Sequence, residues 1–365
     1  MSIISTISRL IKFIIVNIYS FYIIIKNMLK NLKHSNILID SFGRKIDYLR
    51  ISVTDRCNLR CTYCMPEKMK FLPKKDILSF EEMEILCEKF IHRGIRKIRI
   101  TGGEPLVRKG IIEFISSLNN YKDNNLLDEI TMTTNGTLLE KYAEDLFNSG
   151  VRRLNISLDT LSENKFNKIT LRNDLTKVLK GIEKAKRIGF KIKINTVVLK
   201  NTNVDEIPNI ISWAHSNDFN ISLIETMPLG DVENNRFDEY FPINKMVEII
   251  ERNFTLEKSN YKTSGPSNYF KVKETNKELG LITPLSNNFC SNCNRIRITC
   301  TGLLYMCLGQ DNKIDFKEIL RSGDNYLLNN AIDLAMKKKP EKHEFKINNR
   351  NESAKIKRHM SVTGG

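Results

Sequence analysis

The chain has 365 residues, of which 41% are hydrophobic, so it contains enough apolar material for a buried core and is not an intrinsically disordered protein. It carries 58 Lys and Arg residues against 42 Asp and Glu residues, a formal net charge of +16. A basic surface favours polyanions, but this excess is spread along the whole chain, in which Ile, Asn, Phe and Tyr are also abundant. We therefore attribute the charge to general amino-acid usage and predict no nucleic acid among the partners.

Residues 1–35 differ from the rest of the chain. The run 10–25, LIKFIIVNIYSFYIII, is apolar but contains Lys12 and Asn17. It is short for a membrane span, which needs roughly 20 apolar residues, and no small-residue cleavage site of a signal peptide follows it. A membrane anchor is one alternative, and we favour a true start at Met28, which would leave this segment outside the protein.

From residue 47 the sequence alternates β-rich runs with helical patterns. Six runs are predicted strands: 47–53, 96–100, 128–133, 151–157, 190–198 and 219–225. The helical patterns between them begin at Ser79 and cover 109–119, 138–149, 174–188 and 205–217. Ser79 and Glu82 form a capping-box pattern that starts a helix, and Gly150 and Gly189 stand where helices end. Six strand–helix units predict an α/β fold with parallel strands, an open partial (β/α)6 barrel that carries functional residues at the C-terminal ends of its strands.

This alternation stops after about residue 230. The patterns beyond it predict a smaller C-terminal α+β domain, with a helix near 243–252, short strands around 268–306 and helices near 315–337. The predicted boundaries are 36–235 for the barrel, 236–340 for the C-terminal domain and 341–365 for a tail that ends in Gly-Gly.

Eight cysteines in a chain of this length do not indicate a small secreted disulfide scaffold. Six of them form two groups of three: Cys57, Cys61 and Cys64, and Cys290, Cys293 and Cys307. Such grouping is typical of metal-binding thiolates in a reducing compartment, so we predict a cytoplasmic protein.

The first cysteine group has the spacing C-x3-C-x2-C and follows the first predicted strand. Thiolates select iron–sulfur clusters, zinc or copper(I). A four-iron cluster uses one cysteine per iron, so three cysteines leave one iron open to another ligand. The alternative is a zinc site completed by a remote histidine, although none of the five histidines is near this group in the sequence.

This group resembles the signature of the radical S-adenosylmethionine (SAM) enzymes, which have an aromatic residue before the third cysteine, here Tyr63. In that family the amino and carboxylate groups of SAM bind the open iron, and one electron from the cluster releases a 5′-deoxyadenosyl radical. The stretch TGGEP (101–105) matches the family's glycine-rich segment for the methionine amino group. A tight strand-to-helix turn is the alternative explanation of those glycines.

The second cysteine group has the spacing C-x2-C-x13-C over 290–307. Within it, Arg295 and Arg297 share one face of a predicted strand, because alternate residues of a strand point to the same side. Guanidinium groups suit phosphate oxygens, which indicates a substrate with an anionic part. Taken alone, the group is more typical of a structural zinc or cluster that only holds the C-terminal domain together, with the two arginines on the solvated surface. Cys300 is interpreted as a bystander, and an exchange of ligand roles with Cys307 is the alternative.

From about residue 38 onward the chain resembles the GTP 3′,8-cyclase family, whose reaction starts molybdenum cofactor biosynthesis. The stretches that carry the resemblance include DSFGRKIDYLRISVTDRCNLRCTYCMP, IRITGGEPLVR, TTNGTLL, VRRLNISLDTL, ITPLSNNFCSNCNRIRIT and the closing GG. The resemblance implies a barrel of the radical SAM type with two four-iron clusters at opposite ends of one cavity. The implied ligands are Cys57, Cys61 and Cys64 for the SAM cluster, and Cys290, Cys293 and Cys307 for a cluster that binds the guanine base of GTP.

The resemblance also implies individual binding residues. Family positions that line SAM correspond to Tyr63, Gly103, Ser157 and Met227. Positions that contact GTP correspond to Arg50, Arg99, Thr133, Lys193, Arg295, Ile296 and Arg297. Gly364 and Gly365 match a double-glycine tail that reaches into the cavity, where a Cβ would not fit. The chain departs from the family at Ser222, where arginine is frequent, and at Thr363, where a branched aliphatic residue is usual.

The implied reaction is a radical cyclisation. The 5′-deoxyadenosyl radical takes the hydrogen from ribose C3′ of GTP, C3′ attacks C8 of guanine, and an electron and a proton complete (8S)-3′,8-cyclo-7,8-dihydroguanosine 5′-triphosphate. The family further implies a homodimer, an external electron donor and delivery of the product to cyclic pyranopterin monophosphate synthase. Two other functions stay open at this point, a radical SAM maturase with an auxiliary cluster that acts on a peptide, and a non-catalytic metal-binding module.

Overall fold

The computed structural model describes residues 37–230, 232, 236–286, 289–345 and 356–364. The predicted N-terminal extension, Gly365 and part of the predicted tail lie outside these described residues. Within the same ranges, no helix has the length and apolar character needed to cross a membrane.

All six predicted barrel strands are present, with ends within two residues of the predicted ones. They are β1 (Tyr48–Ser52), β2 (Lys97–Thr101), β3 (Glu129–Thr134), β4 (Arg153–Ser157), β5 (Lys191–Val197) and β6 (Asn220–Ile224). The helices between them are α2 (Phe80–His92), α3 (Ile111–Asp123), α4 (Leu139–Asn148), α5 (Glu163–Thr170), α6 (Leu175–Ile188) and α7 (Ile207–Ser216). The alternation of strands and helices is therefore confirmed.

Local sequence signals explain where these helices begin and end. Ser79 Oγ accepts a hydrogen bond from the Glu82 N–H at 3.1 Å, and the Glu82 carboxylate accepts one from the Ser79 N–H at 2.7 Å, the predicted capping box. Helix α6 ends at Gly189, whose φ of +99° lies in the left-handed region that glycine adopts without strain. Helix α5 is missing from the sequence prediction, because its buried Phe166 and Ile169 provide little more than one apolar turn.

The C-terminal segment extends the barrel sheet at both edges. Its elements are α8 (Arg236–Glu239), α9 (Ile243–Ile250), β7 (Leu256–Lys258), β8 (Asn268–Val272), β9 (Lys277–Ile282), β10 (Arg295–Ile298), β11 (Leu303–Tyr305), β12 (Lys313–Asp315), α10 (Lys317–Ser322), α11 (Asn325–Lys338) and α12 (Met360–Thr363). The sheet has the order β12-β11-β10-β1-β2-β3-β4-β5-β6-β9-β8-β7, in which β10 is parallel to β1 and β9 is parallel to β6. The C-terminal strands thus belong to the same sheet, and the two functional halves share one continuous scaffold.

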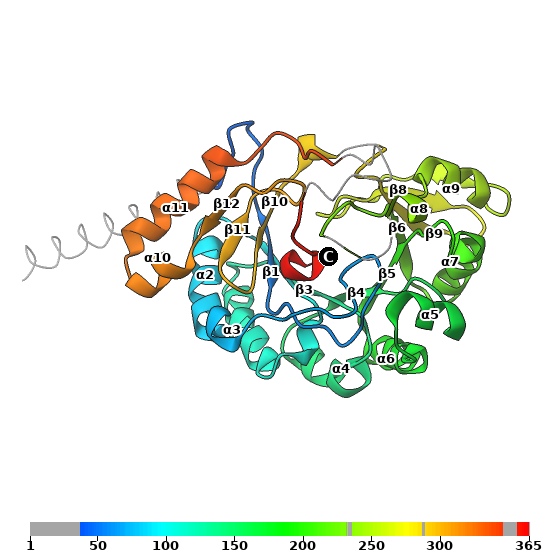
Figure 1. Cartoon of the computed structure of the whole chain (residues 1–365), viewed down its shortest axis with the longest axis horizontal. Helices are drawn as coiled ribbons and strands as arrows, with labels where there is room; N and C mark the ends of the chain where they lie inside the picture. Colours follow the sequence, from blue (N-terminus) through cyan, green and yellow to red (C-terminus); the bar gives the residue numbers. More distant parts are fainter. Residues whose placement is uncertain (1–36, 231, 233–235, 287–288, 346–355, 365) are drawn as a thin grey trace, which may run out of the picture.

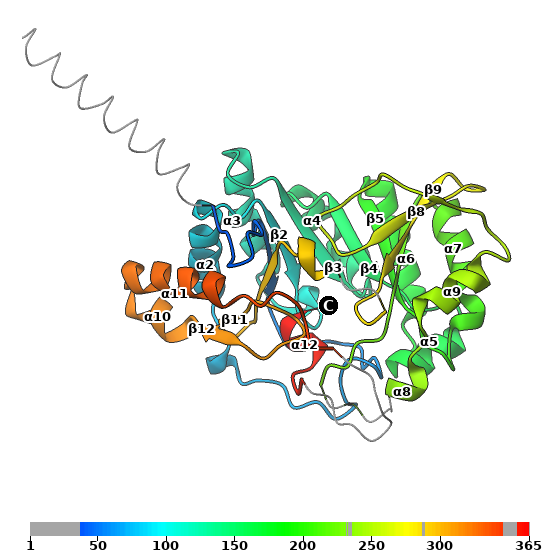
Figure 2. The same ribbon diagram turned by 90° about the horizontal axis from the view of Figure 1, so that it is seen from above.

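The sheet is strongly curved, and its two surfaces have different roles. Figure 1 shows helices α2 to α7 on the outer side of the curve and the short C-terminal helix α12 on the inner side, an arrangement that the perpendicular view in Figure 2 also shows. The outer surface packs against the helices. The inner surface lines a central space.

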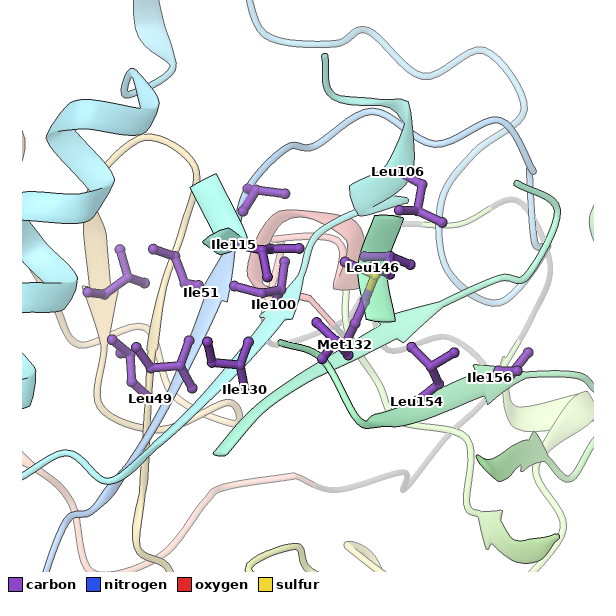
Figure 3. Packing of buried hydrophobic residues seen from close by; sticks show 14 of the residues in the cluster. Leu49, Ile51, Ile100, Leu106, Ile115, Ile130, Met132, Leu146, Leu154 and Ile156 are labelled. Carbon is purple, nitrogen blue, oxygen red and sulfur yellow. The ribbon is translucent and has the colours of Figure 1, made fainter. Parts of the chain in front are cut away.

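Alternate strand residues form the core between the sheet and the outer helices. Leu49 and Ile51 of β1 point outward and pack in one hydrophobic cluster with Ile115 of α3 and Leu146 of α4, as Figure 3 shows. Because successive residues of a strand point to opposite faces, Arg50 between them points to the inner side. The apolar outward positions therefore fix which side chains face the central space.

Candidate active site

The central space is a cavity of about 880 Å³ that contains most of the predicted GTP and second-cluster residues. It brings together residues from both halves of the chain, namely Arg50, Arg99, Lys193, Met227, Cys290, Cys293, Arg295, Arg297 and Cys307. Thr133 lies beside it and accepts a hydrogen bond from Arg99 at 3.4 Å. Ile296 pairs with Leu49 in the sheet and belongs with it to the outer core, so its side chain points away from the cavity.

Three arginines form a row across neighbouring strands on the cavity side. Arg297 of β10 pairs with Arg50 of β1, and Arg50 pairs with Arg99 of β2. Side chains that pair directly in a parallel sheet point to the same side, so the guanidinium groups are neighbours. Their exposed fractions are 9% for Arg297, 7% for Arg50 and 8% for Arg99. Within the described ranges none of the three forms an ion pair, so the row is a concentration of uncompensated positive charge.

The electrostatics of the cavity reflect this crowding. Burial lowers the pKa of Arg50 well below its usual value, and the charges of Arg297 and Arg99 lower it further. Burial, followed by the charge of Arg295, lowers the pKa of Arg297 to about 10. A polyanion in the cavity would reverse these shifts, because it supplies the missing counter-charge.

Two residues outside the predicted set lie beside these cations: Arg153 lines the cavity, and Tyr269 contacts Lys193. Arg153, at the start of β4, donates a hydrogen bond to Glu129 at 2.8 Å, so its charge is already compensated. Tyr269 accepts a hydrogen bond from Lys193 at 3.4 Å. Sequence patterns gave no sign of either contact, because each joins residues of different strands, 24 and 76 positions apart in the chain.

The second cysteine group lies at one end of this cavity. Cys290 begins a short 3-10 turn, Cys293 follows it, and Cys307 comes after β11. Burial raises the pKa of the Cys293 thiol, but the neighbouring charges of Arg295 and Lys339 outweigh burial and bring it down to about 7. Such a thiol is readily available as a thiolate, the form that binds metal.

Cys300 lies apart from that group. It belongs to the hydrophobic core, burial raises the pKa of its thiol to about 12, and its charged neighbours are Asp55 and Arg108. The thiol of Cys307, by contrast, interacts with those of Cys293 and Cys290. The structure thus places Cys307 with the other two thiols, as the interpretation of Cys300 as a bystander requires.

The first cysteine group lies in the loop that follows β1. Cys57, Cys61 and Cys64 are half-buried, and the Cys57 thiol lies 3.7 Å from the Asn135 amide nitrogen. Arg60 donates a hydrogen bond to the Cys57 carbonyl at 2.6 Å and so fixes the start of the loop. Burial raises the pKa of Cys61, and the neighbouring thiols of Cys64 and Cys57 raise it further, so the three sulfurs are close to one another.

Tyr63, the aromatic residue before the third cysteine, is held by an acidic partner that the sequence did not indicate. Its hydroxyl donates a hydrogen bond to Asp159 at 2.7 Å, while the other carboxylate oxygen of Asp159 accepts one from the Val197 N–H at 2.8 Å. Burial raises the pKa of Asp159 to about 6. Tyr63 and Asp159 line a small recess together with Cys61 and the predicted SAM residue Ser157.

The TGGEP stretch packs directly against the cysteine loop. A Cβ on Gly103 would overlap the backbone of Arg56 and come within 2.8 Å of the Asp55 carbonyl oxygen. The fully buried Glu104 accepts hydrogen bonds from Thr134 at 2.9 Å and from the Asn135 N–H at 2.7 Å. The glycines therefore allow close approach of the protein's own backbone, which agrees with the alternative explanation of a tight turn and positions the segment beside the first cysteine group.

The C-terminal tail reaches the arginine row from inside the barrel. The Gly364 carbonyl accepts a hydrogen bond from Arg297 at 3.0 Å. Gly364 has a φ of +74°, and a Cβ there would come within 2.8 Å of the Thr101 Cβ. The predicted reason for a glycine at this position thus agrees with the structure, while Gly365 lies outside the described residues.

The two departures from the family occupy tight positions. The Ser222 hydroxyl lies 3.1 Å from that of Ser267, in the space that the absent Cβ of Gly280 leaves open. The Thr363 side chain is fully buried, and its hydroxyl has no hydrogen-bond partner within the described part of the chain. Ser222 is therefore accommodated by local packing, whereas nothing in the structure explains the hydroxyl of Thr363.

Both cysteine groups have the character of cluster ligands. Each offers three neighbouring thiols, and Asn135 in the first group and Lys339 in the second point an N–H donor at a sulfur. Among the described residues, no three His, Cys, Asp or Glu side chains converge as a single bound metal ion requires. A four-iron cluster makes a different demand, since each cysteine binds a separate iron. The residues present therefore fit iron–sulfur clusters.

Comparisons with known proteins agree with this geometry. Residues 51–214 match the Radical SAM superfamily, and residues 219–345 match the Molybdenum Cofactor Synthesis C family. The crystal structure of Streptococcus suis SuiB bound to S-adenosylmethionine has the same fold, with a TM-score of 0.57 at 16% identity over 93% of this chain and 83% of that one. The fold and the first cysteine group define a radical SAM enzyme, and membership of that superfamily implies a four-iron cluster and SAM.

Relatives that are named for their activity identify the family within the radical SAM enzymes. The GTP 3′,8-cyclase of Agrobacterium fabrum is 50% identical over 338 residues, which cover 92% of this chain and 97% of that protein. The GTP 3′,8-cyclase of Sinorhizobium medicae is 51% identical over 329 residues, 90% of this chain and 94% of that protein. The chain belongs to the GTP 3′,8-cyclase family.

Proposed function

We propose that the protein converts GTP to (8S)-3′,8-cyclo-7,8-dihydroguanosine 5′-triphosphate, the first step of molybdenum cofactor biosynthesis. The observation that carries this proposal is the row Arg297–Arg50–Arg99, which is buried with no carboxylate partner among the described residues, in a cavity that also holds the second cysteine group. A triphosphate supplies about four negative charges, and its hydrogen bonds to guanidinium groups are charge-assisted. Lys193 and Arg295 add to the same field, and Thr133 supports Arg99.

The first cysteine group is the proposed site of the SAM cluster. Cys57, Cys61 and Cys64 would hold three irons and leave the fourth for the amino and carboxylate groups of SAM. Residues proposed to line SAM are Tyr63, Gly103, Ser157 and Met227. Asp159 would keep the Tyr63 ring in place by accepting a hydrogen bond from the Tyr63 hydroxyl.

The second cysteine group is the proposed site of a second four-iron cluster. Cys290, Cys293 and Cys307 would leave one iron open for the guanine base, with the arginine row beyond it for the triphosphate. Gly364 lies between the arginine row and the TGGEP turn, and so between the two ends of the site.

When bound, the SAM cluster supplies the 5′-deoxyadenosyl radical that takes the hydrogen from ribose C3′. The residues of the chain itself orient GTP so that C3′ and guanine C8 are held close together. The buried cavity lining limits access of water to the carbon radical, and Lys193 adds a positive charge to the side of the cavity that would hold the phosphates. These are tasks of positioning and exclusion, and no strong base among the cavity residues is needed.

The finer biological setting follows from family membership. We propose that the enzyme acts as a homodimer in the cytoplasm, takes electrons from an external donor and passes its product to cyclic pyranopterin monophosphate synthase. The proposed product keeps its 5′-triphosphate intact. This is consistent with a following enzyme that acts on the triphosphate group as well as on the ring system.

Anaerobic incubation of the reconstituted protein with GTP, SAM and a reductant tests the proposal. We expect the cyclic product, about eight irons per chain, and 5′-deoxyadenosine that forms only when GTP is present. Cys307→Ala should lose about four irons and all cyclisation, whereas Cys300→Ala, the matched control, should lose neither. Release of 5′-deoxyadenosine without GTP, or an active Cys307→Ala variant, would contradict the proposal.

GTP binding should also be linked to proton uptake at Lys193. Burial, then the charges of Arg99, Arg153 and Arg50, lower the pKa of this ammonium from 10.5 to about 7. An unfolded lysine stays protonated between these two values, so the stability of the GTP-free protein should rise with pH across that window. A bound triphosphate favours the charged ammonium, so GTP affinity should fall as the pH rises above about 7.

Calorimetric titration of GTP without SAM, in two buffers of different ionisation enthalpy, counts the protons taken up. Lys193→Met should reduce proton uptake at pH 8 and flatten the dependence of affinity on pH. Lys180→Met is the control for the loss of a lysine charge, because Lys180 is exposed and lies outside the cavity. Equal proton uptake in Lys193→Met and the unmodified protein would refute this assignment.

A further inference from the structure

Lys339, directly after α11, is a buried cation beside the second cysteine group. Its side chain is among the buried ones, and the residue is only 2% exposed. The ammonium donates hydrogen bonds to the Arg295 carbonyl at 3.1 Å and the Met306 carbonyl at 2.8 Å, and it lies 3.7 Å from the Cys293 thiol. These three contacts join β10, the turn of Cys293 and the segment that leads into Cys307.

The charge of Lys339 lacks a carboxylate partner. Among the described residues it forms no ion pair, and the groups whose negative charge favours its ammonium are first the thiols of Cys293 and Cys307 and then the carboxylate of Asp40, which is paired with Arg44. Burying an unpaired ammonium costs several kcal/mol by desolvation, roughly the scale known for buried ions. Thiolates that bind a cluster would provide the missing negative charge, so the lysine and the ligand set are complementary.

Two further cations, Arg44 and Arg358, donate hydrogen bonds to backbone carbonyls in the segments that carry Cys290 and Cys307. Arg44 donates to the Cys290 carbonyl at 2.8 Å, and Arg358 donates to the carbonyls of Cys307, at 3.4 Å, and Leu308. Both of these arginines pair with an aspartate, Asp40 for Arg44 and Asp311 for Arg358. Of these three cations only Lys339 contacts a sulfur, and the same Cys293 sulfur has a second, more distant donor in Arg295 at 4.0 Å.

We propose that Lys339 is a positioning residue for the second cluster. Its ammonium holds the segments of Cys293 and Cys307 together and places a positive charge and an N–H donor beside the Cys293 sulfur. This inference rests on the proposed function, because it assumes the ligand set Cys290, Cys293 and Cys307. Groups behind the ligands of a metal site typically change metal affinity about 10- to 100-fold when they are removed, and hydrogen bonds and charge near the sulfurs set the cluster's reduction potential.

The test uses the full chain with Cys57, Cys61 and Cys64 replaced by alanine, so that only the second cluster remains. In this parent, Lys339→Met should speed iron loss to a chelator about tenfold and lower the midpoint potential measured by electron paramagnetic resonance. Lys338→Met is the matched control, since Lys338 is the exposed neighbour one residue earlier. In the reciprocal parent, with Cys290, Cys293 and Cys307 replaced, Lys339→Met should leave the first cluster unchanged.

The possible results separate the two levels of the proposal. If the parent binds four irons and Lys339→Met matches it in both measurements, the role of Lys339 is rejected and the second cluster stands. If the parent binds no iron, both ideas are rejected. Lys339→Gln, which keeps an N–H donor without the charge, serves where Lys339→Met does not fold as judged by circular dichroism, and it too should lower the potential.

Discussion

Arg50→Met is expected to make the GTP-free protein more stable while it weakens GTP binding about 100-fold. Arg50 is buried between Arg297 and Arg99, and its Nε and Nη2 atoms have no hydrogen-bond partner within the described ranges. Replacing buried ionic groups by apolar residues of similar volume is often stabilising, by about 1–4 kcal/mol. The same change removes a charge-assisted contact to the triphosphate, and a loss of about 2.7 kcal/mol corresponds to the expected weakening.

Thermal unfolding of anaerobic protein, with and without GTP, measures both effects of Arg50→Met. The midpoint should be higher than that of the unmodified protein without GTP, and GTP should raise it much less. Arg252→Met is the control for the loss of a positive charge, because Arg252 is exposed and lies outside the cavity. A lower midpoint without GTP, together with unchanged GTP affinity, would show that Arg50 serves the fold rather than the substrate.

Gly364→Ala is expected to reduce cyclisation by about 100-fold and to leave the iron content unchanged. The added Cβ would overlap the Thr101 side chain, and the φ of +74° at this residue strains any side chain. Thr101 ends β2 and leads into the TGGEP turn, so the tail would have to move away from the site. That movement would also break the hydrogen bond from Arg297 to the Gly364 carbonyl and let the arginine turn away from the triphosphate.

Gly323→Ala is the matched control for this substitution. Gly323 also has a positive φ, +71°, but no atom lies within 4 Å of the position that its Cβ would take. Both variants thus place a side chain at a positive φ, but Gly323, with a ψ of 5°, lies in the left-handed helical region, whereas Gly364 has a ψ of 136° and the added clash at the site. Product formation and iron content should therefore be near normal in Gly323→Ala. Equal loss of cyclisation in both variants, or normal cyclisation in Gly364→Ala, would remove the tail from the mechanism.

The sequence was sufficient for the local features of the site. The spacing of Cys57, Cys61 and Cys64 and the aromatic Tyr63 depend on neighbours along the chain, and they identified the superfamily before any geometry was known. The alternation of strands and helices likewise predicted the barrel, because the repeat of apolar residues is set by each element alone. The short helix α5 escaped detection, since its apolar pattern is too brief to distinguish it from a loop.

Contacts between distant segments required the structure. Tyr63 contacts Asp159, which lies 96 residues away in the sequence, and Cys293 contacts Lys339, which lies 46 residues away. No sequence period connects such positions. The contacts of Arg153 with Glu129 and of Tyr269 with Lys193 are of the same kind. Family resemblance supplied residues that touch the substrate, but it did not indicate those that hold the binding residues in place.

By itself, then, the sequence determined the fold class, the two groups of thiols and the alternation that turns Arg50, Arg295 and Arg297 to one face of their strands. Only the tertiary structure decided that Arg297, Arg50 and Arg99 are adjacent and that Gly364 reaches them from the far end of the chain. The physical reason is that the face to which a side chain points follows from the two-residue repeat of its own strand. Which residues of neighbouring strands lie next to each other depends instead on the register between the strands. Register is set by how the apolar residues on the outer face pack against the helices, and that packing involves the whole molecule.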